Sequence, residues 1–153
     1  MAQEKCLICE KHGQSTFEIF RDAFLVVNHF VPHPDENDNY LGYYMIESRR
    51  HFKGIYDATD EEAAAIGQMM RALGKAMKTV LNAAHVYSFV MGDGIDHLHV
   101  HMVARYAAAP REYYGPKVDE WPSAPRGGAE SVQKINRKVA EALRGALFEN
   151  EPK

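Results

Sequence analysis

Three histidines alternate with apolar residues in the second half of the chain. They are His97, His99 and His101, and Leu98 and Val100 separate them. Successive side chains of a β-strand point to opposite faces, so an extended segment places the three imidazoles on one face. On a helix the same spacing would turn each ring by about 200° from the last. Imidazole acts as nucleophile, acid, base or metal ligand near neutral pH, so this row predicts a functional strand.

The histidine row admits two kinds of chemistry: transition-metal binding and covalent catalysis at phosphorus by a central imidazole. A second candidate group is the pair Cys6 and Cys9, which are the only cysteines of the chain. A C-x-x-C pair in a reducing compartment indicates metal binding or redox chemistry more than a structural disulfide. His12 follows closely and is a rival ligand. Three other histidines are expected to face solvent: His29, His33 and His85.

Length and composition indicate an ordinary protein domain. The chain has 153 residues, of which 46% are hydrophobic, which is enough for a sizeable core. A formal net charge of −3 argues against a broad nucleic-acid-binding surface. The sequence has no apolar run long enough to span a membrane. Because its start also lacks the apolar region of a signal peptide, we expect a cytoplasmic protein.

The elements that must position these residues are predicted from apolar periodicity and turn signals. Strands are expected at residues 16–20, 23–30, 40–47, 85–91 and 97–105. Thr59 and Glu62 form a capping-box signature for a helix that runs to about residue 81, and a second helix is predicted over residues 129–147. The proline- and aromatic-rich segment 106–128 is predicted to be an ordered loop. Without β–α–β regularity, this order favours an α+β fold on an antiparallel five-stranded sheet with two main helices.

The run from His97 to Val103 resembles the signature of the histidine triad family, in which histidines alternate with apolar residues. Val26-Val27-Asn28 and the segment from Tyr40 to His51 resemble the family's first nucleotide-binding strand and its second strand with a basic turn. The resemblance covers about residues 6–106. It implies a HIT-like fold in which residues 1–153 form one domain, with a C-terminal loop and helix added to the core at residues 107–148.

The family resemblance implies a nucleotide-binding hydrolase or transferase. Its substrates would be dinucleoside polyphosphates or nucleoside phosphoramidates, cleaved through a covalent nucleotidyl-histidine intermediate. The resemblance makes His99 the nucleophile, places His101 at the phosphate and Asn28 near the ribose, and requires no catalytic metal. It also implies a homodimer, with a nucleotide as the other partner and neither nucleic acid nor membrane.

The bacterial-type branch of the family also carries a structural zinc ion. The resemblance assigns its ligands to Cys6, Cys9, His51 and His97. Two thiolates and two imidazoles make a closed tetrahedral set, as structural zinc sites do. Such a site would attach the N-terminal segment to the histidine strand.

The chain departs from the family pattern at four positions. Asp93 and Gly94 stand where members often carry a polar residue that handles the leaving group, Ala104 replaces a proline, and Tyr43 replaces a histidine. An aspartate beside a polyphosphate repels it unless the carboxylate is protonated or paired. Two alternatives therefore stay open. One is a zinc-stabilised nucleotide-binding or interaction module with little catalysis, and the other is a metal-dependent enzyme in which all three triad histidines bind a transition metal.

Overall fold

The computed structural model describes residues 5–149, which form an α+β fold around one large antiparallel sheet. Its five strands lie in the order β1-β2-β4-β6-β5. The strands are β1 (Glu18–Arg21), β2 (Leu25–His29), β4 (Tyr43–Ser48), β5 (His85–Phe89) and β6 (His99–Arg105). The predicted fold class and the five-stranded antiparallel sheet are confirmed.

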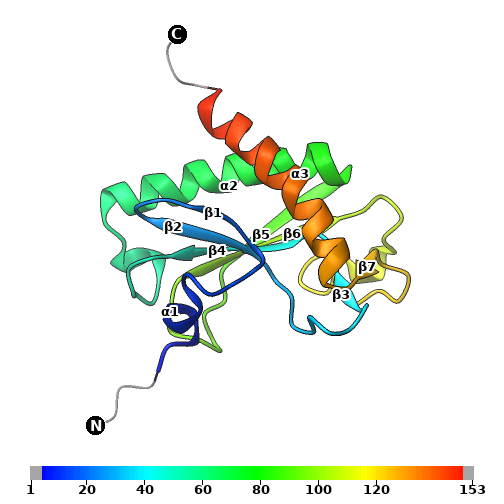
Figure 1. The fold of residues 1–153 in the computed structure, drawn as a ribbon, viewed down its shortest axis with the longest axis horizontal. Coiled ribbons are helices and arrows are strands. Elements are labelled where there is room, and N and C mark those ends of the chain that lie inside the picture. Colours follow the sequence, from blue (N-terminus) through cyan, green and yellow to red (C-terminus); the bar gives the residue numbers. More distant parts are fainter. Residues whose placement is uncertain (1–4, 150–153) are drawn as a thin grey trace.

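Two long helices cover one face of the sheet. Helices α2 (Asp60–Leu81) and α3 (Ala129–Phe148) lie on the same side of it, and the short helix α1 (Leu7–Lys11) lies on the other (Figure 1). Leu73 of α2 and Leu143 of α3 are fully buried in the core between helices and sheet. We call the sheet face that α2 and α3 leave uncovered the open face. Within residues 5–149, the helices are too short or too polar to cross a membrane.

The start of α2 has the predicted capping box. Glu62 N–H donates to Thr59 Oγ1 at 3.2 Å, and Thr59 N–H donates to Glu62 Oε2 at 2.9 Å. The Glu62 carboxylate also accepts two hydrogen bonds from Arg50, which lower the pKa of Glu62 to about 2. A single turn of 3-10 helix, η1 (Ile55–Asp57), precedes the helix. Local sequence thus fixes where α2 begins.

Strand β6 separates the core from the open face. Its even-numbered positions and the residue just before it belong to the helix-covered core: Leu98, Val100, Met102 and Ala104. His99 and His101 alternate with them and lie on the open face. His97 lies two residues before the first residue of the strand and is fully buried. The predicted strand is therefore present, although it begins at the second histidine.

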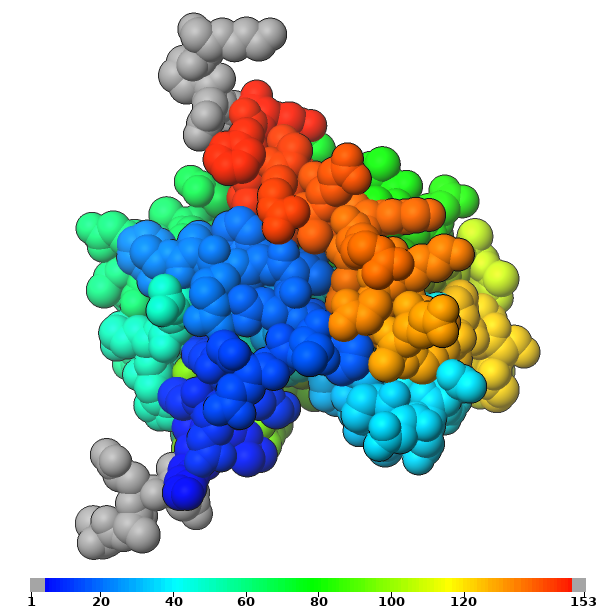
Figure 2. All heavy atoms as spheres, viewed as in Figure 1, coloured from blue at the N-terminus to red at the C-terminus, as the bar shows by residue number. Residues whose placement is uncertain are grey.

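The segment 106–128 packs on one end of the open face. It contains the 3-10 turn η2 (Arg111–Tyr113) and strand β7 (Arg126–Gly127), which pairs with β3 (Asn39–Tyr40). Figure 2 shows its yellow and orange surface beside the cyan residues that lead into β3. The buried members of this second apolar cluster are Tyr40, Val103, Ala109, Val118, Trp121 and Ala124. The predicted ordered loop is thus part of the folded structure, and it narrows the open face to the region around the histidines.

Candidate functional site

Four side chains from distant parts of the sequence converge beside the start of β6. The ligand atoms of Cys6, Cys9, His51 and His97 all lie within 4.8 Å of one another. His97 Nδ1 is 3.3 Å from Cys6 Sγ, 3.4 Å from Cys9 Sγ and 3.2 Å from His51 Nδ1. Tetrahedral zinc, with bonds of about 2.3 Å to sulfur and about 2.0 Å to nitrogen, sets such atoms about 3.3–3.8 Å apart. The three distances from His97 Nδ1 are close to this spacing, and the four predicted ligands form one cluster.

The surroundings of His97 prepare its ring to bind a metal. Nε2–H donates to the carbonyl oxygen of Ser48 at 2.6 Å, which leaves the Nδ1 lone pair directed at the cysteines. Burial lowers the pKa of His97 and so favours the neutral ring that a metal ligand must have. Burial and the neighbouring Cys6 thiol raise the pKa of Cys9, so two free thiolates are disfavoured here without a cation.

His12, the rival ligand, is not a member of this cluster. Its Nε2 lies 3.2 Å from Glu47 Oε2, and its ring meets the His97 ring edge-on with centroids 5.7 Å apart. The ring thus lies against the outside of the ligand set. Its partner is a carboxylate on the open face.

His99 is held with one nitrogen engaged and the other available. Its Nδ1–H donates to the carbonyl oxygen of His97 at 2.6 Å, which places the lone pair on Nε2. None of the hydrogen bonds among residues 5–149 uses Nε2 of this ring. His99 as a residue is 7% exposed, and the centroid of its ring lies 4.9 Å from that of His101. An imidazole in this state can act as a nucleophile.

His101 lies between two aromatic rings. It stacks on Phe89 at 4.7 Å with an angle of 10° between the planes, and its Nδ1 is 2.8 Å from the hydroxyl of Tyr43. Burial, followed by the charge of His99, lowers the pKa of His101 to about 4. Burial also raises the pKa of Tyr43 to about 12. At neutral pH the pair is thus a neutral imidazole beside an intact phenol, and the Tyr43 that departs from the family pattern is its partner.

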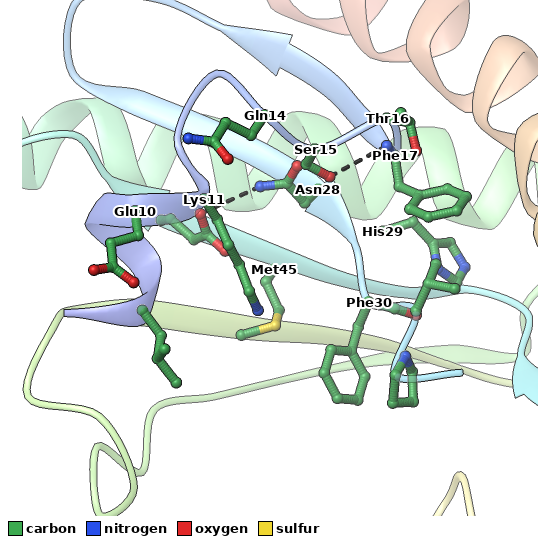
Figure 3. A pocket seen from close by; sticks show the side chains of 14 residues that line it. Glu10, Lys11, Gln14, Ser15, Thr16, Phe17, Asn28, His29, Phe30 and Met45 are labelled. Carbon is green, nitrogen blue, oxygen red and sulfur yellow. Dashed lines mark hydrogen bonds between the residues drawn. The ribbon is translucent and has the colours of Figure 1, made fainter. Parts of the chain in front are cut away.

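A pocket of about 660 Å³ lies over β2 and β4 on the open face, and neither His99 nor His101 is among the residues that line it. Figure 3 shows Glu10 and Lys11 of α1 on one side of it, with Asn28 of β2 and Met45 of β4 facing them. Met45 lines the pocket and is the cross-strand partner of His101, so the pocket and the histidines lie on neighbouring strands of the open face. Phe17 and Phe30 supply apolar wall beside these polar groups. A planar, partly polar ligand can lie here with its charged end at β6.

A buried carboxylate lies at the inner end of this pocket. Glu47 is only 4% exposed and is the cross-strand partner of His99. Its Oε2 accepts from Asn28 Nδ2 at 3.2 Å in addition to the contact with His12. Burial raises the pKa of Glu47 to about 7. Sequence reasoning missed this residue, although period-two alternation along β4 places it on the same face as Tyr43 and Met45.

The predicted leaving-group positions lie on the other side of the metal cluster. Asp93 and Gly94 are exposed and line a hollow of about 470 Å³ together with Cys6 and His51. Arg105 is directed away from the histidines: its guanidinium lies 4.0 Å above the ring of Tyr114, and its Nη1 donates to another tyrosine hydroxyl. The structure therefore does not bring these polar groups to the histidine pair.

The expectation that His29 faces solvent is wrong. On β2 its side chain points to the helix-covered face, where it is 3% exposed. Nδ1–H donates to the Phe30 carbonyl at 2.9 Å, and Nε2 accepts from Gly42 N–H at 3.0 Å. Burial lowers the pKa of His29 to about 4. His33 and His85 are exposed, as expected.

Comparison with known proteins decides the family. A model described as "Scavenger mRNA decapping enzyme C-term binding", which represents a histidine-triad-like family, matches residues 3–112, more than half of the chain. The chain belongs to the histidine triad family. This is a family of nucleotide-binding hydrolases and transferases. No curated protein matches this histidine triad protein by sequence.

Solved structures share the fold of this histidine triad protein. A HIT-like protein from Bartonella henselae has a TM-score of 0.66 at 11% identity, over 93% of this chain and 99% of that one. A zinc-bound histidine triad family protein from Mycobacterium smegmatis has a TM-score of 0.64 at 14% identity, over 92% and 94%. A histidine triad protein from Marinobacter aquaeolei VT8 reaches 0.68 at 20% identity, over 92% and 97%.

Proposed function

We propose that the protein cleaves nucleoside phosphate derivatives, such as dinucleoside polyphosphates or nucleoside phosphoramidates, through a nucleotidyl intermediate on His99. The observation that carries this proposal is the state of the His99 ring. Nδ1–H is held by the His97 carbonyl at 2.6 Å, and Nε2 is free on the open face beside a second neutral imidazole. Packing alone requires no such arrangement.

The proposed reaction has two displacements at phosphorus. His99 Nε2 forms a bond to the α-phosphorus, and the bond from phosphorus to the leaving group breaks, so that an anhydride leaving group departs as a phosphate anion. The positive charge that develops on the ring is stabilised by the His97 carbonyl at Nδ1–H. Water then attacks phosphorus, the P–N bond breaks, and its electron pair returns to Nε2. The water gives up one proton to solvent, and the products are a nucleoside monophosphate and free His99.

Two further residues are proposed to bind the nucleotide. His101 lies 4.9 Å from His99, ring to ring, so its Nε2 is in position to meet a phosphate oxygen on the same face. Asn28 lines the pocket and has a buried carbonyl oxygen, Oδ1, without a hydrogen-bond partner. A ribose hydroxyl would satisfy that oxygen. This supports the nucleoside in the pocket and the phosphate at β6.

We also propose that Cys6, Cys9, His51 and His97 hold a structural zinc ion, and that no catalytic metal is needed. The spacing of the four ligand atoms and the hydrogen bond from His97 to Ser48 support this. A bound zinc ion supplies a cross-link between α1 and the start of β6. The alternative in which all three triad histidines bind one metal is not favoured, because among the described residues His97 Nδ1 clusters with Cys6, Cys9 and His51, and neither His99 nor His101 belongs to that cluster.

The decisive experiment compares wild type with His99→Ala on diadenosine polyphosphates and adenosine phosphoramidates. Loss of the nucleophile is expected to lower kcat by about a thousandfold or more. The matched control is His85→Ala, which removes an exposed histidine of the same sheet and is expected to keep wild-type turnover. Acid-labile, base-stable labelling of wild type by α-labelled substrate, absent in His99→Ala, would identify the intermediate. Equal turnover by wild type and His99→Ala would overturn the proposal.

A second candidate function is a zinc-stabilised nucleotide-binding or interaction module. It is favoured by one observation: Asp93 and Gly94 lie beside Cys6 and His51, and Arg105 is occupied by tyrosines, so no polar leaving-group donor of that kind reaches the histidine pair. Tight binding of nucleoside monophosphates without any product over hours would support this module. Measurable turnover that depends on His99 would exclude it.

We further propose a cytoplasmic homodimer, as the family resemblance implies. Light scattering of the purified protein tests the assembly: a mass twice that of one chain is expected, and a monomer at all concentrations would contradict it. Fractionation of cells that express the chain tests the location.

A further inference from the structure

The inner end of the large pocket contains two hydrogen-bond acceptors that are not used within the protein. One is Asn28 Oδ1, which is buried and has no partner among the described residues. The other is Glu47 Oε1, because both hydrogen bonds found for this carboxylate go to Oε2. A buried acceptor without a donor, such as Asn28 Oδ1, is unfavourable. The folded protein therefore has two acceptor atoms here that hydrogen-bond donors of a ligand can satisfy.

The two acceptors are fixed in place by their other atoms. Asn28 Nδ2 donates to Glu47 Oε2 at 3.2 Å, and this bond is the dashed line at Asn28 in Figure 3. His12 Nε2 contacts the same oxygen at 3.2 Å from the side of α1. These contacts fix the carboxylate plane and the orientation of the amide. Oε1 and Oδ1 thus lie on neighbouring strands, β4 and β2, at the edge of a single pocket.

A pair of fixed acceptors selects the chemistry of its ligand. Above pH 7, where Glu47 is mostly ionised, its carboxylate repels the negatively charged phosphate oxygens and favours the orientation in which phosphate lies at the histidines. A ligand group at Glu47 and Asn28 must offer two donors on neighbouring atoms. In a nucleotide two groups do so: the 2′,3′-diol of ribose, and the N1–H and N2–H edge of guanine.

We propose that Glu47, acting with Asn28, is the specificity-determining residue of this pocket and requires two adjacent hydrogen-bond donors on the bound nucleotide. This inference rests on the proposed function, because it takes the pocket to be the nucleoside site. It goes beyond that function in assigning a role to Glu47, and it makes His12 the residue that holds Glu47 in position. The ribose diol and the guanine edge are the two sources of the same donor pair.

Equilibrium binding to the zinc-loaded full-length protein, measured above pH 7 so that Glu47 is mostly ionised, distinguishes the two sources. The probes are AMP, its 2′-deoxy and 3′-deoxy analogues, GMP and IMP, which lacks the N2 amino group. If the diol is the donor pair, AMP binds about tenfold or more tightly than either deoxy analogue, and GMP and IMP bind alike. If the guanine edge is the donor pair, GMP binds about tenfold or more tightly than IMP, and the deoxy analogues lose little.

The variant Glu47→Gln assigns that discrimination to the residue. Its amide would present a donor where the nucleotide presents another donor, so the preference seen in wild type is expected to fall to within about twofold. Glu61→Gln, the same change at an exposed position of α2, is expected to retain the wild-type preference. Zinc content and thermal unfolding of each variant report whether it has folded.

Each outcome decides the proposal. Wild type that binds nucleotides without either preference overturns the inference and leaves the proposed function intact, and this arm requires no variant. A folded Glu47→Gln protein that keeps the wild-type preference overturns the role of Glu47. Wild type that binds none of the five nucleotides overturns the proposed function and the inference with it.

Discussion

Tyr43 places its hydroxyl 2.8 Å from His101 Nδ1, and both groups are neutral at ordinary pH because burial lowers the pKa of His101 to about 4 and raises that of Tyr43 to about 12. A phenol that donates to Nδ1 leaves the ring proton on Nε2. His101 would then donate to a phosphate oxygen without carrying a charge. The tyrosine that departs from the family pattern thus has a positioning role to test.

Tyr43→Phe is expected to remove this control of the His101 tautomer. The ¹⁵N chemical shifts of His101 should indicate Nε2–H in wild type and a mixture of tautomers in the variant. We expect kcat to fall by about tenfold or more, with little change in nucleotide affinity. Tyr87→Phe, on the neighbouring strand, is the control and should leave the His101 shifts unchanged. Identical His101 spectra for wild type and Tyr43→Phe would contradict the assignment.

His29 makes stability depend on pH. Its pKa is about 4 in the folded protein, against an ordinary value of 6.5, so between these values the unfolded chain binds a proton that the folded chain does not. Stability from this group is complete above pH 6.5 and is lost as the pH falls towards 4. The cause is visible in the hydrogen bonds, because a protonated Nε2 would meet the N–H of Gly42.

His29→Gln is expected to lose less stability on acidification than wild type does. Between pH 8 and pH 5 the difference in the free energy of unfolding should be about 2 kcal/mol smaller for the variant. At pH 8 the variant should itself be less stable, because the buried hydrogen bonds are imperfectly replaced. Urea unfolding at both pH values measures this, with the exposed His85→Gln as control. A wild-type pH dependence retained in His29→Gln would rule His29 out as its source.

At the scale of elements, α1 is held by side chains more than by its own backbone. It has five residues, and isolated helices of that length are unstable in water. Its N-terminal capping residue is Cys6 and its third residue is Cys9, so two of the proposed zinc ligands flank Leu7 and Ile8. The His12 that follows reaches Glu47 on β4. Metal binding and the wall of the large pocket therefore share one short element.

Removal of zinc is expected to release this element. Wild type should contain about one zinc ion per chain, and Cys9→Ser should lower zinc affinity more than tenfold. Amide hydrogen exchange over α1 should then become faster, whereas α2 should change little. His12→Ala is the control, because the structure places His12 outside the ligand set. Zinc retained by Cys9→Ser, or lost from His12→Ala, would contradict the assignment.

Elements with a strong local pattern were predictable from the sequence, and short ones were not. The alternation along β6 and the capping box at Thr59 and Glu62 encode their own geometry. Helix α1 and the two-residue strands β3 and β7 are too short for any period to show. The same limit applied within the site. Glu47 is part of the site because its carboxylate contacts His12, which is 35 residues away, and no local sequence pattern predicts such a contact.

At the scale of the whole molecule, the two faces of the sheet are covered by different parts of the chain. Helices α2 and α3 cover one face, and the segment 106–128 covers one end of the other (Figure 1). The single tryptophan, Trp121, belongs to the second cluster and is 5% exposed. Val103 of β6 belongs to the same cluster, and β6 also carries the proposed nucleophile. The two faces are thus joined through β6.

We therefore expect one cooperative unfolding transition, with the same midpoint for probes on either face of the sheet. Trp121 fluorescence reports the open face, and far-ultraviolet circular dichroism reports the helices. Their urea midpoints should coincide in wild type, since β6 is shared. Val103→Ala should lower the free energy of unfolding by about 1–3 kcal/mol, and both midpoints should fall together. A fluorescence transition that precedes the loss of helix would show that the segment 106–128 unfolds independently.

The alternation along β6 also sets how this strand can vary in evolution. From residue 98 to residue 104 the even-numbered side chains fill the helix-covered core, while His99 and His101 face the proposed substrate. If every substitution were tested along this strand, even-numbered and odd-numbered positions should therefore differ in which residues they tolerate. Even positions would accept apolar residues of similar volume, and positions 99 and 101 would reject all of them. A one-residue insertion would exchange the two sets, which makes β6 the segment of this chain least able to accept a change in length.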